Sequence, residues 1–198
     1  MLVVVGGHSR NLGKTSLAAE LIHRFRERNW AAVKITQYGH TVCTNHDHHC
    51  GCEPEPGEDY ALTEEYEPDS TDSARFLAAG AGRAFWLRTQ AGRLPQAVGA
   101  IRKILDQHEN VMVESNSIVE FFRPDLFLML LDFGCTDFKD SSLRLMDRAD
   151  AFIVLERGRN SPVWENAAQG RWELRPRFAV QPPPYLSPAV ADFVSARF

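Results

Sequence analysis

The sequence predicts an α/β protein whose core is a mostly parallel sheet with helices on both faces. Short apolar runs, rich in β-branched residues, alternate with segments whose apolar residues recur at helical spacing. Strands that are apolar throughout are typical of parallel sheets, because helices cover both faces of such a sheet. A length of 198 residues suits one domain over residues 1–198.

The elements are expected in a regular order along the chain. Strands are predicted at residues 2–5, 30–35, 84–88, 111–114, 126–131 and 151–155. Helices are predicted at residues 15–28, 71–79, 94–108, 141–148 and 188–198. The segment 37–70 lacks a sustained apolar pattern, so we interpret it as a loop or small subdomain inserted after the second strand. The pattern also weakens from residue 158.

The composition argues against a nucleic-acid-binding, membrane or secreted protein. Apolar residues make up 44% of the chain and charged residues 24%, as in ordinary globular proteins. The 22 basic and 26 acidic residues give a net charge of −4, so neither nucleic acid nor an anionic membrane is expected as a partner. No apolar run approaches the roughly 20 residues that span a bilayer. The four cysteines do not resemble a secreted disulfide framework, and the first strand does not resemble a signal peptide. We therefore expect a cytoplasmic protein.

The first sixteen residues contain a candidate phosphate-binding loop. An apolar strand leads through Gly7-x5-Gly13-Lys14-Thr15 into an amphipathic helix. Backbone N–H groups at a helix N-terminus attract anions. The candidate nucleotide-binding residues are Gly7, Asn11, Leu12, Gly13, Lys14, Thr15 and Ser16. The common pattern G-x-x-x-x-G-K-[ST] fails by one position, because His8 stands where its first glycine belongs. His8 itself could contact a phosphate or simply pack.

Each residue type in this loop has a predicted role. Lys14 would neutralise the β- and γ-phosphates, and the Thr15 hydroxyl would bind Mg²⁺. Glu114 ends a buried strand and suits the acidic residue that holds Mg²⁺ or its water, although it could be a surface acid in a turn. Asp132 ends another strand, and it could equally be such a site residue or an ordinary acid. Asp72 could simply cap a helix.

The insert carries a cluster of cysteine and histidine residues. Thiolates and imidazoles at short spacing suit Zn²⁺ or another late transition metal. Any four of its candidate ligands could close a tetrahedral site: Cys43, His46, His48, His49, Cys50 and Cys52. The alternative is a polar loop that is merely rich in these residues, because the spacing matches no standard zinc-finger pair.

At this point the chain resembles a known family. The relevant features are Lys34, Asp72-Ser73-x-Arg75, Ala79-Gly80-Ala81 and Val113-Glu114-Ser-Asn116. Their order over residues 1–155 resembles the MobB family of molybdopterin guanine dinucleotide biosynthesis. The longer loop also resembles that of dethiobiotin synthetase, which belongs to the same class as the nickel-insertion GTPases.

The resemblance implies a P-loop NTPase fold and a homodimeric, GTPase-like adapter. Such an adapter would assist the enzyme that joins a nucleotide to molybdopterin. By carry-over, Lys14 and Thr15 bind phosphate and Mg²⁺, while Asp72 and Glu114 are acids on the metal side; Lys14, Asp72 and Glu114 are the candidate catalytic residues. No Asn-Lys-x-Asp guanine-reading motif is present, so GTP and ATP both stay open.

Three functions fit these features. The first is a MobB-like, GTP-preferring protein of molybdenum cofactor maturation, with slow Mg²⁺-dependent hydrolysis and a transition-metal site in the insert. The second is a metallochaperone GTPase that delivers a metal ion. The third is an ATP-dependent ligase or kinase that resembles dethiobiotin synthetase. An adapter that binds nucleotide without turnover is a further variant.

Overall fold

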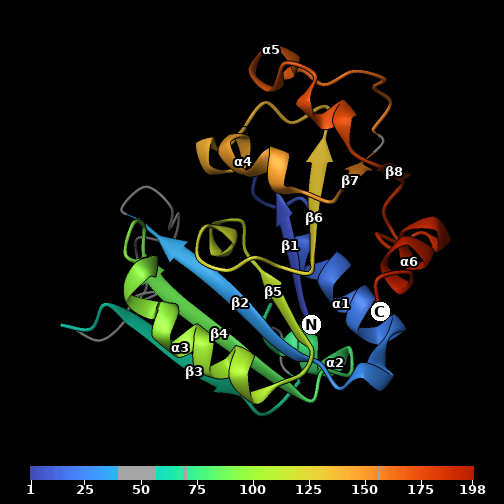
Figure 1. The fold of residues 1–198 in the computed structure, drawn as a ribbon. Coiled ribbons are helices and arrows are strands. Elements are labelled where there is room, and N and C mark those ends of the chain that lie inside the picture. The colour runs from blue at the N-terminus through green and yellow to red at the C-terminus, as the bar shows by residue number, and fades with distance from the viewer. Residues whose placement is uncertain (40–56, 69–70, 156) are drawn as a thin grey trace.

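The computed structural model describes residues 1–39, 57–68, 71–155 and 157–198. The described strands form one sheet of eight, in the order β3-β4-β2-β5-β1-β6-β7-β8 (Figure 1). Their bounds are Leu2–Gly7 (β1), Ala31–Tyr38 (β2), Tyr60–Glu65 (β3), Arg83–Gln90 (β4), Val111–Glu114 (β5), Leu126–Asp132 (β6), Ala151–Leu155 (β7) and Arg177–Val180 (β8). All neighbouring pairs are parallel except β3 with β4. The predicted mostly parallel sheet is therefore confirmed.

Helices cover both faces of this sheet, also as predicted. The first face packs against α1 (Lys14–Arg24), α2 (Ala74–Ala78) and α6 (Pro188–Ser195). The second packs against α3 (Leu94–Gln107), α4 (Asp140–Leu145) and α5 (Glu165–Ala168). Short 3₁₀ turns complete the described part: η1 (Arg26–Arg28), η2 (Ser117–Glu120), η3 (Met146–Arg148) and η4 (Arg171–Leu174). No helix in these described ranges is both long and apolar enough to cross a membrane.

Strand β1 lies in the middle of the sheet and fixes the position of the candidate phosphate-binding loop. We call this loop, residues 7–13, the glycine loop. Leu2 and Val4 face one apolar cluster, whereas Val3 and Val5 face the other. Side chains alternate along a strand, so an apolar residue at every position is what burial on both faces requires. Because β1 pairs in parallel with β5 and β6, its carboxyl end lies between the carboxyl ends of these two buried strands. Ligands of open parallel sheets bind at this kind of edge.

The structure differs from the sequence-based expectation at the sheet margins. Strand β3 lies within the segment 37–70 that we interpreted as a loop or small subdomain, and it joins the main sheet antiparallel to β4. Edge strands have one neighbour and are partly exposed, so they lack a continuous apolar run. Glu64 of β3 instead forms two 2.6 Å contacts with the Arg83 guanidinium of β4. The opposite edge strand, β8, was also missed, and β2 extends to Tyr38 rather than ending at residue 35.

The C-terminal segment folds back onto the glycine loop. The Glu20 carboxylate of α1 accepts hydrogen bonds from the backbone N–H groups of Tyr185 and Leu186, at 3.2 and 2.7 Å. The Tyr185 ring then lies directly against Gly13. A β-carbon at position 13 would lie only 2.1 Å from that ring, and Gly13 also has a left-handed φ of 90°. Both constraints require glycine at the start of α1.

The replacement Gly13→Ala should therefore destabilise the protein. We expect its free energy of unfolding to fall by about 2 kcal/mol or more, because left-handed backbone alone costs an alanine about 1–2 kcal/mol. Urea unfolding measures the change. Gly99 provides the matched control, since it lies within α3 with open space around its α-carbon. Gly99→Ala should raise the free energy of unfolding by about 0.5–1 kcal/mol. Equal effects of the two replacements would show that position 13 does not require glycine.

Candidate functional site

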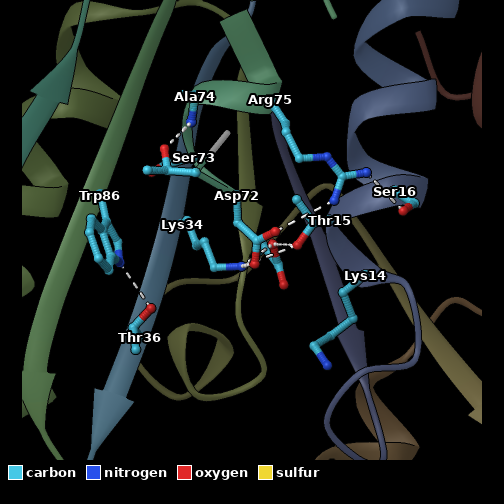
Figure 2. A network of polar contacts seen from close by, with 12 residues as sticks. Lys14, Thr15, Ser16, Lys34, Thr36, Asp72, Ser73, Ala74, Arg75 and Trp86 are labelled. Carbon is cyan, nitrogen blue, oxygen red and sulfur yellow. Dashed lines mark hydrogen bonds and ion pairs between the residues drawn. The ribbon is translucent and has the colours of Figure 1, made fainter. Parts of the chain in front are cut away.

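Three polar side chains surround the ammonium group of Lys34 at the carboxyl edge of the sheet. Figure 2 shows two of them, Thr15 and Asp72, pointing toward Lys34. In the register of β2 against β5, Lys34 lies opposite Glu114. Lys34 Nζ donates to Asp72 Oδ2 at 2.6 Å, Thr15 Oγ1 at 3.1 Å and Glu114 Oε2 at 3.3 Å. Thr15 Oγ1 in turn donates to Glu114 Oε2 at 2.7 Å. We call Thr15, Lys34, Asp72 and Glu114 the Lys34 cluster.

Burial makes the charges in this cluster depend on one another. The Glu114 side chain is 8% exposed and that of Lys34 16%, whereas Asp72 is half-exposed. A buried carboxylate is costly unless a cation and hydrogen-bond donors surround it, and Lys34 and Thr15 supply both. Burial alone would raise the Asp72 pKa, but the hydrogen bond and charge of Lys34, with help from Arg75, hold that pKa below its ordinary value.

Asp72 links Lys34 of β2 to Arg75 of α2 instead of capping α2. Arg75 Nη1 lies 3.5 Å from Asp72 Oδ1, and Arg75 Nη2 donates to Ser16 Oγ of α1 at 3.1 Å. The first backbone N–H of α2, that of Ala74, is bound by Thr71 Oγ1 at 3.1 Å. The side chain of Asp72 is therefore free to face Lys34, and the capping alternative raised by the sequence is not what the structure shows.

The glycine loop and the Lys34 cluster together line a hollow of about 480 Å³. Of the loop residues that the sequence predicts, Asn11, Leu12, Gly13, Lys14, Thr15 and Ser16 line it. Gly7 lies behind the lining, where its N–H donates to Asn116 Oδ1 and its carbonyl accepts from Asn116 Nδ2, each at 2.8 Å. This pair of hydrogen bonds fixes the start of the loop against the end of β5.

Positive charge dominates the rest of this hollow. Lys14 Nζ donates to the backbone carbonyl of Ser9 at 2.8 Å and points away from the Lys34 cluster (Figure 2). Burial lowers the pKa of Lys14 to about 8, and the charges of Lys139 and Lys34 add to that effect. Additional lining residues that sequence reasoning did not single out for this site are Arg10, Lys139 and Tyr185. A polyanion is the ligand that these charges would stabilise.

The oxygen atoms of the Lys34 cluster suit a divalent cation. Thr15, Asp72 and Glu114 point their oxygens at one positive charge, that of the Lys34 ammonium. Mg²⁺ prefers such hard oxygen donors and usually takes one or two carboxylates together with phosphate oxygens. The residues present therefore fit Mg²⁺ held jointly with a bound phosphate. Within the described ranges, no group of three or more His, Cys, Asp or Glu residues forms a metal site by itself.

Two other polar residues at strand ends, His8 and Asp132, make structural contacts away from the hollow. His8 is fully buried, with its ring stacked on Phe138 at 4.9 Å and tilted against Trp164 at 5.4 Å. Burial lowers the pKa of His8 to about 4, against the opposing pull of the Asp132 and Asp137 backbone groups, so the ring is neutral. Asp132 pairs with Arg157 at 3.1 Å and accepts from the Gly134 N–H at 2.8 Å. Neither residue is among those that line the hollow.

The predicted ligands of the insert, Cys43, His46, His48, His49, Cys50 and Cys52, lie outside the described residues. The structure therefore does not test that metal site.

Comparison with known proteins gives a distant structural likeness. No protein-family model matches the sequence, and no curated protein matches it. Among solved structures, "apo" form LpxK from Aquifex aeolicus in complex with ATP matches with a TM-score of 0.47 and 16% identity, over 90% of this chain and 53% of that one. The signal recognition particle 54 kDa protein from Aeropyrum pernix K1 in complex with GDP matches with a TM-score of 0.47 and 15% identity, over 99% of this chain and 45% of that one. The chain thus spans about half the length of the structures it matches.

Proposed function

We propose that this protein is a P-loop NTPase-like protein that binds a nucleoside triphosphate together with Mg²⁺. The observation that carries the proposal is the meeting of the glycine loop with the Lys34 cluster at one hollow. The loop provides an anion site at the start of α1, and the cluster provides oxygen ligands directly beside it. A magnesium–nucleotide complex requires both.

The residues of the chain divide this work. The backbone N–H groups at the start of α1 face the phosphates, and Lys14 turns from the Ser9 carbonyl toward the β- and γ-phosphates. Thr15 and Glu114 hold the metal, with Asp72 near enough to bind it or one of its waters. Mg²⁺, when bound, neutralises charge on the phosphate oxygens. The Tyr185 ring lines the hollow beside Gly13.

Within this function we propose a MobB-like role in molybdenum cofactor maturation. The support is that three segments which carry the resemblance, around Lys34, Asp72–Arg75 and Glu114, converge on one cluster. The proposal includes a preference for GTP, slow hydrolysis, a homodimer and a partner enzyme of cofactor biosynthesis. Binding assays with GTP and ATP separate it from the ATP-dependent alternative that resembles dethiobiotin synthetase.

The replacement Lys14→Ala tests nucleotide binding. We expect the Kd for the magnesium nucleotide to rise by about 100-fold, because two hydrogen bonds to a charged group are worth about 3 kcal/mol or more. Isothermal titration calorimetry with GTP and with ATP measures the change. Lys103→Ala on the exposed side of α3 is the matched control and should leave the Kd unaltered. Failure of both nucleotides to bind the unmodified protein would end the proposal.

The pH dependence of the same Kd tests the role of the Lys14 charge. With a pKa of about 8 in the nucleotide-free protein, Lys14 carries its proton below pH 8 and loses it above that pH. Binding to phosphate favours the protonated amine, so above pH 8 the Kd should rise by up to about tenfold per pH unit. Lys14→Arg should flatten this rise, since arginine keeps its charge.

The replacement Lys34→Met tests whether Lys34 and a metal ion occupy the same position. It removes the cation that now lies among Thr15, Asp72 and Glu114, and it leaves two carboxylates close together. We expect the Mg²⁺ concentration for half-maximal thermal stabilisation to fall by about tenfold, which corresponds to about 1.4 kcal/mol. The readout is the change in Tm as Mg²⁺ is added without nucleotide. Lys103→Met should respond as the unmodified protein does, and an unchanged Mg²⁺ requirement in Lys34→Met would place the metal elsewhere.

A transition-metal site in the segment 37–70 is a separate proposal that rests on the sequence alone. It expects one stoichiometric ion, most simply Zn²⁺, in protein purified from metal-free buffers. Elemental analysis should show that ion lost in the double variant Cys50→Ser/Cys52→Ser and retained in Cys135→Ser, whose cysteine is free and remote in sequence. Protein without any bound ion would favour the alternative that residues 43–52 are only a polar stretch rich in cysteine and histidine.

A further inference from the structure

A second hollow, of about 470 Å³, adjoins the one at the glycine loop. It lies at the carboxyl ends of β2 and β5, where the start of α3, the η2 turn and the start of α4 form its walls. The two hollows have several lining residues in common: Arg10, Lys14, Ile35, Gln37, Glu114 and Lys139. Its volume falls within the range of sites for small molecules. A ligand there would lie next to any phosphate that Lys14 holds.

Cations crowd together where the two hollows meet. Burial lowers the pKa of Lys139, and the charge of Arg10 lowers it further. Burial also lowers the pKa of Lys14, with Lys139 as the next contribution. Lys139 thus repels both Lys14 and Arg10, and bound anions would relieve that repulsion. The triphosphate is one such anion, and Arg10 and Lys139 also face the second hollow.

Arg144 adds a cation that lines the second hollow without lining the first. Its Nη2 lies 3.6 Å from Glu120 Oε1, and the two side chains are 68% and 38% exposed. A pair this open to solvent contributes little to stability, so the guanidinium can turn toward a ligand at small cost. Arginine also matches the geometry of phosphate oxygens with two parallel hydrogen bonds.

The floor of the second hollow is held in place by hydrogen bonds. Asn116 clamps Gly7 and also donates to Ser142 Oγ at 2.7 Å. Gln37 Nε2 donates to Ser117 Oγ at 2.9 Å. The buried Leu94 and the partly buried Phe121 are apolar members of the same lining. The hollow therefore combines four cationic side chains with some apolar surface, and hydrogen bonds tie its lining to the glycine loop.

We propose that the second hollow binds a small molecule that carries a phosphate group, as a second ligand beside the nucleotide. The proposal deepens the proposed function and rests on it, because the shared residues place this ligand against the terminal phosphate of the nucleotide. Arg144 and Lys139 hold its phosphate group, and the surface formed by Leu94 and Phe121 contacts its apolar part. Such a protein would bring two ligands together, whereas a nucleotide hydrolase does not need a second ligand site.

The test uses inorganic phosphate as the probe. The full chain is saturated with Mg²⁺ and a non-hydrolysable analogue of the nucleotide it binds, and phosphate is titrated while amide NMR signals are followed. We expect saturable shifts at Ser117 and Ser141, which line the second hollow. Arg144→Gln should weaken this phosphate binding by about tenfold while nucleotide affinity stays the same. Arg123→Gln removes an exposed arginine that does not line the hollow and should change neither affinity.

Three results would overturn the proposal: no saturable shifts on the nucleotide-loaded protein, displacement of the nucleotide by phosphate, or equal phosphate affinity in Arg144→Gln and the unmodified protein. Failure of the proposed function gives a different result, namely no nucleotide binding at all. The titration is then repeated on the nucleotide-free protein. Shifts at Ser117 and Ser141 that depend on Arg144 support the second hollow in that case, and shifts that do not depend on Arg144 reject it.

Discussion

The burial of Glu114 is the constraint on which the rest of the site depends. A carboxylate that is 8% exposed needs a cation, and the register of β2 against β5 supplies Lys34 directly opposite. A one-residue slip of β2 would turn Lys34 to the other face of the sheet and leave Glu114 without that charge. Thr15 completes the arrangement from α1. The pairing of two strands and the docking of the first helix are thus coupled through one carboxylate.

The same edge of the sheet holds the glycine loop in a fixed position. Asn116, two residues after Glu114, binds both backbone polar groups of Gly7. Tyr185 approaches Gly13 from the C-terminal segment, which Glu20 anchors to α1. Residues more than a hundred positions apart in sequence therefore determine the path of a loop that begins and ends with glycine. The loop is preorganised by its neighbours, since glycine by itself favours many conformations.

Sequence reasoning predicted the parts of this fold that follow from burial. Continuous apolar runs identified the central strands, because strands covered on both faces leave no other pattern. It missed β3 and β8, whose partly exposed edges carry residues such as Glu64 and Arg177. In the site, Gly13-Lys14-Thr15 and Glu114 were recognisable from local context. Tyr185 and Lys139 were not, because they reach the hollow only through long-range folding, and no local spacing records that.

Charge is distributed unevenly across the site, and this distribution restricts its ligand. On one side, Asp72 and Glu114 converge on a position that favours a cation, and the Lys34 ammonium lies there. On the other side, burial and the charge of Lys139 lower the pKa of Lys14, and burial and the charge of Arg10 lower the pKa of Lys139, so an anion is favoured there. A lone anion would satisfy only the second side, and a lone metal ion only the first. A phosphate ligand that brings its own divalent cation would satisfy both, because the metal would take the position of the Lys34 ammonium and the phosphates would separate the crowded cations.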